Sequence, residues 1–248
     1  NNLNSSSVTF TVDNTPPLIT VTSPTNITYS SSSIFFDINL NEAGDLCKFT
    51  LNNWLTNYTM NKNTNTNFNY TNNSIADGSY TTKFSCNDNL NNVNNTVQLT
   101  FSIDTTPPLI TVTSPKNKNY NTTQIAVNFT ADSYQTLWYY NGTANRTYAN
   151  SETIILNDGN YTFLFYANDS VGNLNYTNVT FYIDSIAPTI IINSPEEKTY
   201  GYNTSLSLNF SVSDVSGLSS CWYNLDNNAN TTINCNQNTT FNATDASS

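Results

Sequence analysis

The chain has 248 residues, of which 37% are hydrophobic and only 10% charged, and its net charge is −10. Such an acidic chain lacks the basic surface that nucleic acids and anionic membranes attract, so we expect no nucleic acid partner and no membrane contact from this segment. It contains no histidine, which removes the commonest general base and metal ligand. The adjacent carboxylates, Glu196 and Glu197, precede Lys198 in a predicted loop, so no catalytic residues and no enzyme activity are expected.

One segment occurs three times, with the sequence Asp-x-x-x-Pro near its start. The copies begin at Val12, Ile103 and Ile183 and end at Pro24, Pro115 and Pro195. They recur about 80 to 90 residues apart, which is the size of a small domain. The repeat predicts a closing strand of a preceding or partner domain at 1–14, complete domains at 15–105 and 106–185, and an incomplete domain at 186–248 that lacks its last two strands.

Between these segments, apolar and polar residues alternate with period two, which is typical of half-buried strands. The second strand of each copy repeats the same inward positions: Ile34, Phe36, Ile38 and Leu40; Ile125, Val127, Phe129 and Ala131; Leu206, Leu208, Phe210 and Val212. Turns at Asp77-Gly78 and Asp158-Gly159 start a later strand. The pattern predicts an all-β chain of tandem two-sheet sandwiches.

Short proline junctions join the closing strand of one copy to the first strand of the next. Tandem prolines, as at Pro16-Pro17 and Pro107-Pro108, favour extended backbone and predict stiff joints. Residues 1–13 carry one closing strand, whereas the third copy stops before its last two. This mismatch indicates that the sequence is a piece of a longer array of modules. Alternatively, the strand at residues 5–13 is donated to a neighbouring chain.

The cysteines are interpreted by aligning the copies, which places Cys47 opposite Leu137 and Cys86 opposite Ala167. The second copy therefore lacks both residues together, as a Cys47–Cys86 disulfide predicts. Cys221 and Cys235 flank a predicted hairpin and fall opposite each other, so they also form a candidate pair. Two disulfides indicate an oxidising, extracellular compartment.

These features resemble the tandem immunoglobulin-like (Ig-like) repeats of prokaryotic, especially archaeal, cell-surface proteins. The resemblance rests on the Asp-x-Thr-Pro-Pro junctions, on Asp77-Gly-Ser-Tyr80 and Asp158-Gly-Asn-Tyr161, on 168–173 and on 221–226. The resemblance implies that the chain forms Ig-like sandwiches and has a role in a surface layer, stalk, filament or adhesin. The first copy departs from the pattern, because its segment at residues 87–92 lacks the glycine that the second copy has at Gly172.

N-glycosylation sequons are abundant, although the asparagine-rich composition explains much of their number. Five of them fall on outward strand positions and are the ones we expect to carry N-linked glycans: Asn128, Asn160, Asn168, Asn178 and Asn209. No other cofactor is expected.

Three further features have two interpretations each. Trp138 and Trp222 lie at outward positions where they could contact sugars or a neighbouring module, unless a shift in strand parity buries them. Residues 61–74 are either a flexible polar insertion or a binding arm. No metal is assigned, but Asp13, Asp104 and Asp184 are weak calcium candidates together with Asp88 or Asp169; alternatively, each simply caps a turn.

The sequence therefore predicts a structural extracellular glycoprotein on a cell surface, a stalk or filament whose partners are further repeats or copies of itself. The alternatives are an adhesin that binds glycans or another cell, for which residues 61–74 or the exposed tryptophans would be the contact, and a surface-layer lattice protein with sideways contacts between modules.

Overall fold

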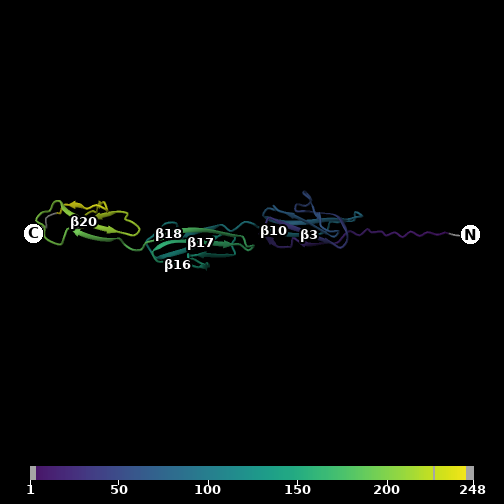
Figure 1. Cartoon of the computed structure of the whole chain (residues 1–248), viewed down its shortest axis with the longest axis horizontal. Helices are drawn as coiled ribbons and strands as arrows, with labels where there is room; N and C mark the ends of the chain where they lie inside the picture. The colour runs from purple at the N-terminus through teal and green to yellow at the C-terminus, as the bar shows by residue number, and fades with distance from the viewer. Residues whose placement is uncertain (1–3, 226, 244–248) are drawn as a thin grey trace. The chain divides into compact units, whose positions relative to one another are not determined.

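The computed structural model describes residues 4–225 and 227–243. Parts of the predicted first and last segments, residues 1–3 and 244–248, and Asp226 of the predicted hairpin lie outside this range. All the helix or strand elements in this range are β-strands, which confirms the all-β prediction. The described residues contain no helix that is long and apolar enough to cross a membrane. The strands form two sandwiches and a third, smaller group, which follow the sequence repeat (Figure 1).

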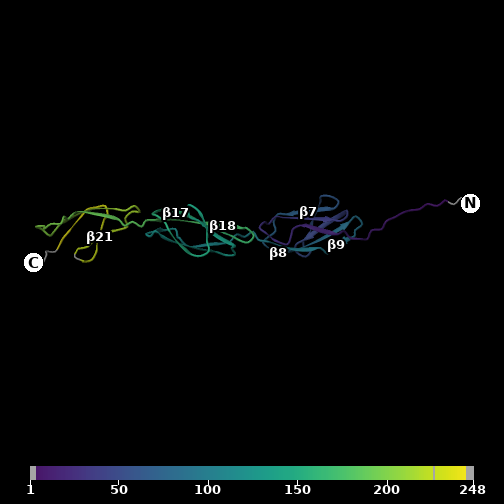
Figure 2. The same ribbon diagram turned by 90° about the horizontal axis from the view of Figure 1, so that it is seen from below.

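The first sandwich contains two sheets with the strand orders β1-β3-β7-β6 and β2-β10-β8-β4-β5, and β9 also pairs with β8. Figure 2 shows β7, β8 and β9 in this part of the chain. The strands are β1 (Ile19–Ser23), β2 (Thr28–Tyr29), β3 (Ile34–Leu40), β4 (Gly44–Thr50), β5 (Tyr58–Thr59), β6 (Asn61–Lys62), β7 (Asn67–Asn72), β8 (Gly78–Asp88), β9 (Val93–Asn94) and β10 (Gln98–Ile103).

The second sandwich repeats this plan with the orders β11-β13-β16 and β12-β18-β17-β14-β15. In both sandwiches a short strand pairs in parallel with the closing strand, with Tyr29 opposite Ile103 and Tyr120 opposite Ile183. The strands are β11 (Ile110–Ser114), β12 (Asn119–Tyr120), β13 (Gln124–Ala131), β14 (Thr136–Tyr140), β15 (Asn145–Thr147), β16 (Glu152–Ile155), β17 (Gly159–Asn168) and β18 (Leu174–Ile183).

The third group of strands is smaller, with a sheet β19-β20-β23 and a separate pair β21-β22. The described residues include no counterpart of β17 and β18. The strands are β19 (Thr189–Ser194), β20 (Leu206–Ser213), β21 (Cys221–Tyr223), β22 (Thr231–Ile233) and β23 (Thr239–Phe241).

The alternating pattern places most of the predicted inward residues in the cores, whereas Ala131, Phe210 and Val212 are half-buried. All four inward residues of β3 are at most 6% exposed, and Ile125, Val127 and Phe129 of β13 are at most 1% exposed. Stacked and edge-on aromatic pairs fill the space between the sheets, such as Phe36 against Phe49 with ring centroids 4.0 Å apart. Such pairs bury large apolar areas and prefer these geometries.

Residues 61–74 are not a flexible insertion. Lys62 and its neighbour form β6, and β7 pairs with β3 over six residues, with Phe68 opposite Ile38. Phe68 is 1% exposed, so its burial in the core holds this asparagine-rich segment in the sheet. The interpretation as a floppy insertion was therefore wrong.

Candidate functional site

Both predicted cysteine pairs are disulfide-bonded in the structure. Cys47 on β4 is the register partner of Cys86 on β8, and their side chains are 0% and 1% exposed. Cys221 at the start of β21 bonds Cys235, just beyond β22. Each bond therefore ties a strand to a segment that follows it in sequence.

A loop near the closing strand of the first sandwich binds the segment that precedes β1. The Asp88 Oδ1 atom accepts hydrogen bonds from the backbone N–H groups of Leu90 and Asn92, both at 2.8 Å. Its Oδ2 atom accepts one from Asn92 Nδ2 at 2.7 Å. The Asn92 amide also donates to the backbone carbonyl of Asp13 at 3.2 Å, and Asn94 Nδ2 donates to the carbonyl of Pro17 at 2.9 Å.

The second sandwich repeats the arrangement on the next junction. Asp169 accepts hydrogen bonds from the backbone and the side-chain amide of Asn173 at 2.9 and 2.8 Å. The Asn173 amide also donates to the carbonyl of Asp104 at 2.8 Å, and Asn175 Nδ2 donates to the carbonyl of Pro108 at 2.8 Å. We call this Asp-x-x-x-Asn-x-Asn loop, residues 88–94 and 169–175, the amide clamp.

The aspartate of each amide clamp is buried and charged. Asp88 is 3% exposed and Asp169 is 4% exposed. Burial raises the pKa of each carboxyl, but hydrogen bonds from the asparagine side chain and from backbone N–H groups outweigh it, and the pKa of both groups lies below the ordinary value. The ionised form therefore fits this site best.

The loop in the first sandwich needs no glycine. Gly172 of the second amide clamp has φ +94°, and its counterpart Asn91 has φ +66°. Asparagine is one of the few other residues that tolerate this left-handed backbone region. The departure from the family pattern is therefore compatible with the same loop function.

The junctions at 104–108 and 184–188 are also bonded to the sandwich that precedes each of them. Asp77 accepts hydrogen bonds from the Thr105 hydroxyl at 2.8 Å and the Thr106 hydroxyl at 2.6 Å, which hold the pKa of Asp77 below its usual value. In the second sandwich, Asp158 accepts hydrogen bonds from the backbone and hydroxyl of Ser185 at 3.1 and 2.8 Å. Polar groups that belong to folded loops thus fix the junction backbone.

The three calcium candidates share one hydrogen-bond contact. Asp13, Asp104 and Asp184 each accept a hydrogen bond from the backbone N–H group two residues later, at 3.0, 3.2 and 3.2 Å. This is the geometry of an Asx turn. Asp13 also lies with Glu42 and Asp88 in an acidic group whose ligand atoms are within 4.8 Å of one another. In the part of the chain that the structure describes, Asp104 and Asp184 belong to no such group.

The five expected glycan sites differ in exposure. Asn128, Asn160 and Asn178 are exposed, whereas Asn168 and Asn209 are half-buried. Both carbonyl groups of Asn168 accept hydrogen bonds within the module: the side-chain carbonyl from the Thr136 hydroxyl, and the backbone carbonyl from the Gln135 N–H group. Asn128, Asn160 and Asn178 are thus the most accessible of the five.

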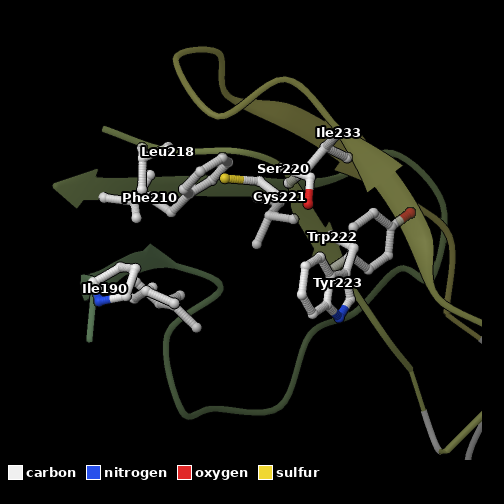
Figure 3. A pocket seen from close by; sticks show the side chains of 12 residues that line it. Ile190, Phe210, Leu218, Ser220, Cys221, Trp222, Tyr223 and Ile233 are labelled. Atoms are coloured by element: carbon white, nitrogen blue, oxygen red, sulfur yellow. The ribbon is translucent and has the colours of Figure 1, made fainter. Parts of the chain in front are cut away.

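Neither candidate tryptophan lies in the core. Trp138 is half-buried between the buried Leu137 and Tyr139, and it pairs in register with Thr147. Trp222 is 57% exposed. It lines an apolar groove of about 330 Å³ in the third group of strands, together with side chains of β19, β20 and β21 (Figure 3).

The amide clamp was missed in the sequence. Its signal was present, because the spacing Asp-x-x-x-Asn-x-Asn occurs in both complete copies at equivalent positions. The abundance of asparagine hid this signal. The acceptors also lie far away in sequence: Asn92 and Asp13 are separated by 79 residues, and Asn173 and Asp104 by 69.

Comparisons with known proteins find the same type of module. Residues 18–105 match the sequence model of the family described as bacterial Ig-like domain. Among solved structures, the fibronectin(III)-like modules of Clostridium thermocellum CbhA are 12% identical, with 67% of this chain and 94% of that chain covered and a TM-score of 0.38.

Two more solved structures are similarly distant. Dimeric latent PorU from Porphyromonas gingivalis is 12% identical, covering 70% of this chain and 21% of that chain, with a TM-score of 0.33. The Ig1-2 module of the Drosophila receptor protein tyrosine phosphatase DLAR is 11% identical, covering 68% and 100%, with a TM-score of 0.29. No curated protein sequence matches this chain.

The family match coincides with the first sandwich, from the start of β1 to the second junction. The second sandwich repeats its strand pairing and its amide clamp, and both disulfides are typical of proteins outside the cytosol. Residues 18–105 are therefore a bacterial Ig-like domain, and the chain is built from tandem Ig-like modules of a secreted or cell-surface type.

Proposed function

We propose that this chain is a structural, non-catalytic part of an extracellular stalk or filament on a prokaryotic cell surface. The observation that carries the proposal is the amide clamp, which occurs at equivalent positions in both complete modules and bonds the junction carbonyls. Asp77 and Asp158 bond the same kind of junction from the preceding module. The junction at 104–108 is bonded to the modules on both sides and would resist bending, which is the property a stalk needs.

The surface chemistry agrees with exposure outside the cell. The described modules carry two disulfides, and exposed sequons lie at Asn128, Asn160 and Asn178. We propose that these three asparagines carry N-linked glycans, which would shield the polar sheet edges from pairing with other proteins. The partners of the chain would be further repeats or other copies of it.

Small-angle X-ray scattering tests the stiffness of the junction. Replacing Asn173 and Asn175 with alanine removes the hydrogen bonds to the carbonyls of Asp104 and Pro108, so we expect a broader distribution of molecular dimensions. Ser170→Ala is the matched control, because Ser170 is exposed in the same loop. Equal distributions for the wild type and the double variant would contradict a stiffening role.

Electron cryo-microscopy of native material tests the assembly. The proposal expects regular contacts between chains and branched density at Asn128, Asn160 and Asn178. Separate flexible rods with bare asparagines would contradict the filament and the glycans, and would favour a simple spacer between other domains.

A further inference from the structure

Two tyrosine rings pair on the outer face of the five-stranded sheet in the second sandwich. The hydroxyl groups of Thr162 on β17 and Thr180 on β18 lie 2.9 Å apart. The rings of Tyr166 and Tyr176 pair across the same two strands, with centroids 5.8 Å apart. Residues at every second position share one face of a strand, so these four side chains lie on the same face. Tyr176 is 60% exposed, which makes this the solvent side of the sheet.

A third ring continues the pair on the next strand. The Thr136 hydroxyl of β14 donates a hydrogen bond to the side chain of Asn168 on β17. Trp138 and Tyr166 are the next residues of that face along these two antiparallel strands, so they fall across from each other. The strands β14, β17 and β18 are neighbours in the sheet. We call Trp138, Tyr166 and Tyr176 the aromatic row.

A glycosylation sequon lies directly beside the aromatic row. Asn178 is the next residue of the outer face after Tyr176, and Thr180, which completes the sequon, is the one after that. Such alternate residues of a strand are roughly 7 Å apart. Asn178 is exposed, so a sugar on its side-chain amide would start within reach of the Tyr176 ring.

The first sandwich lacks both features on the same face. Lys48 of β4 pairs in register with Ser85 of β8, and these two residues are the counterparts of Trp138 and Tyr166. No outward position of β4, β8 or β10 carries an aromatic ring, and no sequon starts in these three strands. The two modules otherwise repeat one plan. The rings and the sequon therefore occur together in one module and are both absent from the other.

We propose that the first sugar of an N-linked glycan on Asn178 packs flat on the Tyr176 ring and becomes part of the second module. The inference rests on the proposed glycan at this site. In the transfer, the bond between C1 of the sugar and the phosphate oxygen of a lipid-linked donor breaks, and a bond between C1 and Asn178 Nδ2 forms. The displaced amide proton leaves with the lipid phosphate.

The contact suits any sugar in the pyranose form. One face of a pyranose ring presents mainly C–H groups, and burying that face against an aromatic ring removes apolar surface from water on both partners. The aromatic row contains no charged side chain, so it offers no preference for an acidic or a basic sugar. The covalent link also holds the sugar beside the ring at a high effective concentration. The glycan would thus lie on the sheet and stabilise it.

A double-mutant cycle on the full chain tests the contact. The chain is secreted from a eukaryotic host that adds high-mannose glycans, which endoglycosidase H trims to a single N-acetylglucosamine, and mass spectrometry gives the occupancy of Asn178. The cycle combines Asn178→Gln, which removes the sugar, with Tyr176→Thr, which removes the ring. Trp138 reports urea unfolding of the second module when Trp54 and Trp222 are replaced by phenylalanine.

The sugar should stabilise the module only when the ring is present. With Tyr176 in place, Asn178→Gln should raise the unfolding equilibrium constant about 2- to 10-fold, the range that aromatic contacts contribute. In the Tyr176→Thr chain the same change should have no measurable effect, whereas Tyr176→Phe keeps the ring and should keep the effect. Asn128→Gln is the matched control, because Asn128 lies on β13 in the opposite sheet between the outward Ala126 and Thr130, and its sugar should show no coupling to Tyr176.

Nuclear magnetic resonance gives a second readout. The C–H protons of the sugar on Asn178 should shift upfield through the ring current in the wild type and in Tyr176→Phe, but not in Tyr176→Thr.

The outcomes separate the inference from the glycan on which it rests. An occupied Asn178 whose sugar has the same effect with and without the Tyr176 ring, or whose protons are not shifted in the wild type, would overturn the inference and leave the glycan in place. Loss of the effect in Tyr176→Phe would also overturn it, because the hydroxyl and not the ring would then carry the contact. A bare Asn178 would contradict the glycan itself and the inference with it.

Discussion

The second module has two apolar residues at the positions that the Cys47–Cys86 disulfide occupies in the first module. The aligned residues in the second module are Leu137 and Ala167, which are 6% and 0% exposed. A Cys47→Leu/Cys86→Ala variant therefore gives the first module a pair that already packs in the same fold. We expect this variant to fold but to be less stable than the wild type.

The expected loss follows from the length of the loop that the disulfide closes. The cysteines are 39 residues apart, and the chain-entropy relation assigns such a cross-link about 4 kcal/mol at 25 °C. Exchanging two cysteines for leucine and alanine roughly conserves volume, so we expect a packing change below about 1.5 kcal/mol in either direction. The first module should thus lose about 2.5 to 5.5 kcal/mol of unfolding free energy.

Urea unfolding measures this loss if the signal comes from the first module alone. Trp54 lies between β4 and β5 and donates its backbone N–H to Thr50 at 3.0 Å, so its fluorescence in a chain with Trp138→Phe and Trp222→Phe follows that module. The m-value should also rise, because the unfolded chain becomes less compact without the cross-link.

The second disulfide supplies the control. A Cys221→Ser/Cys235→Ser variant opens a loop with a sequence separation of 14 and should leave the Trp54 transition unchanged. A loss below about 1 kcal/mol in the Cys47→Leu/Cys86→Ala variant, with the wild-type bond verified by mass spectrometry, would refute the entropic argument.

Four further changes test the core and the amide clamps. Thr82→Val should stabilise the first module by about 1 kcal/mol in urea unfolding, because the buried Thr82 hydroxyl has no hydrogen-bond partner among the described residues; a loss would mean that the hydroxyl is satisfied. Phe165→Ala should cost about 3 to 5 kcal/mol, since this 0%-exposed ring packs on Phe129; a cost below about 1 kcal/mol would show a loosely packed core. Asn173→Ala should speed hydrogen exchange at the backbone amides of Asp104, Thr105 and Thr106, and unchanged rates there would argue against the clamp. The pKa values of Asp88 and Asp169 are lowered from 3.8, so their stabilisation is present above that pH and is lost as the pH falls below it. Acid unfolding should therefore be shallower in Asp88→Asn, and an unchanged profile would assign the acid response to other groups.

The sequence by itself determined the repeat, the strand faces and the cysteine pairs. Period-two alternation is sufficient for a strand with one buried face, because neighbouring side chains point to opposite sides. Comparing copies within one chain identified Cys47 and Cys86 as partners, since both are missing together in the second module.

Only the tertiary structure decided three other matters. The polar composition of residues 61–74 indicated a flexible insertion, but the burial of Phe68 holds β7 against β3. The amide clamp depends on side chains that reach backbone carbonyls 67 to 79 residues away, a distance that no local pattern encodes. The exposure of Ile190 and Trp222 depends on which strands cover them. Local patterns specify which face of a strand is apolar, whereas the partner that covers that face is a property of the assembled fold.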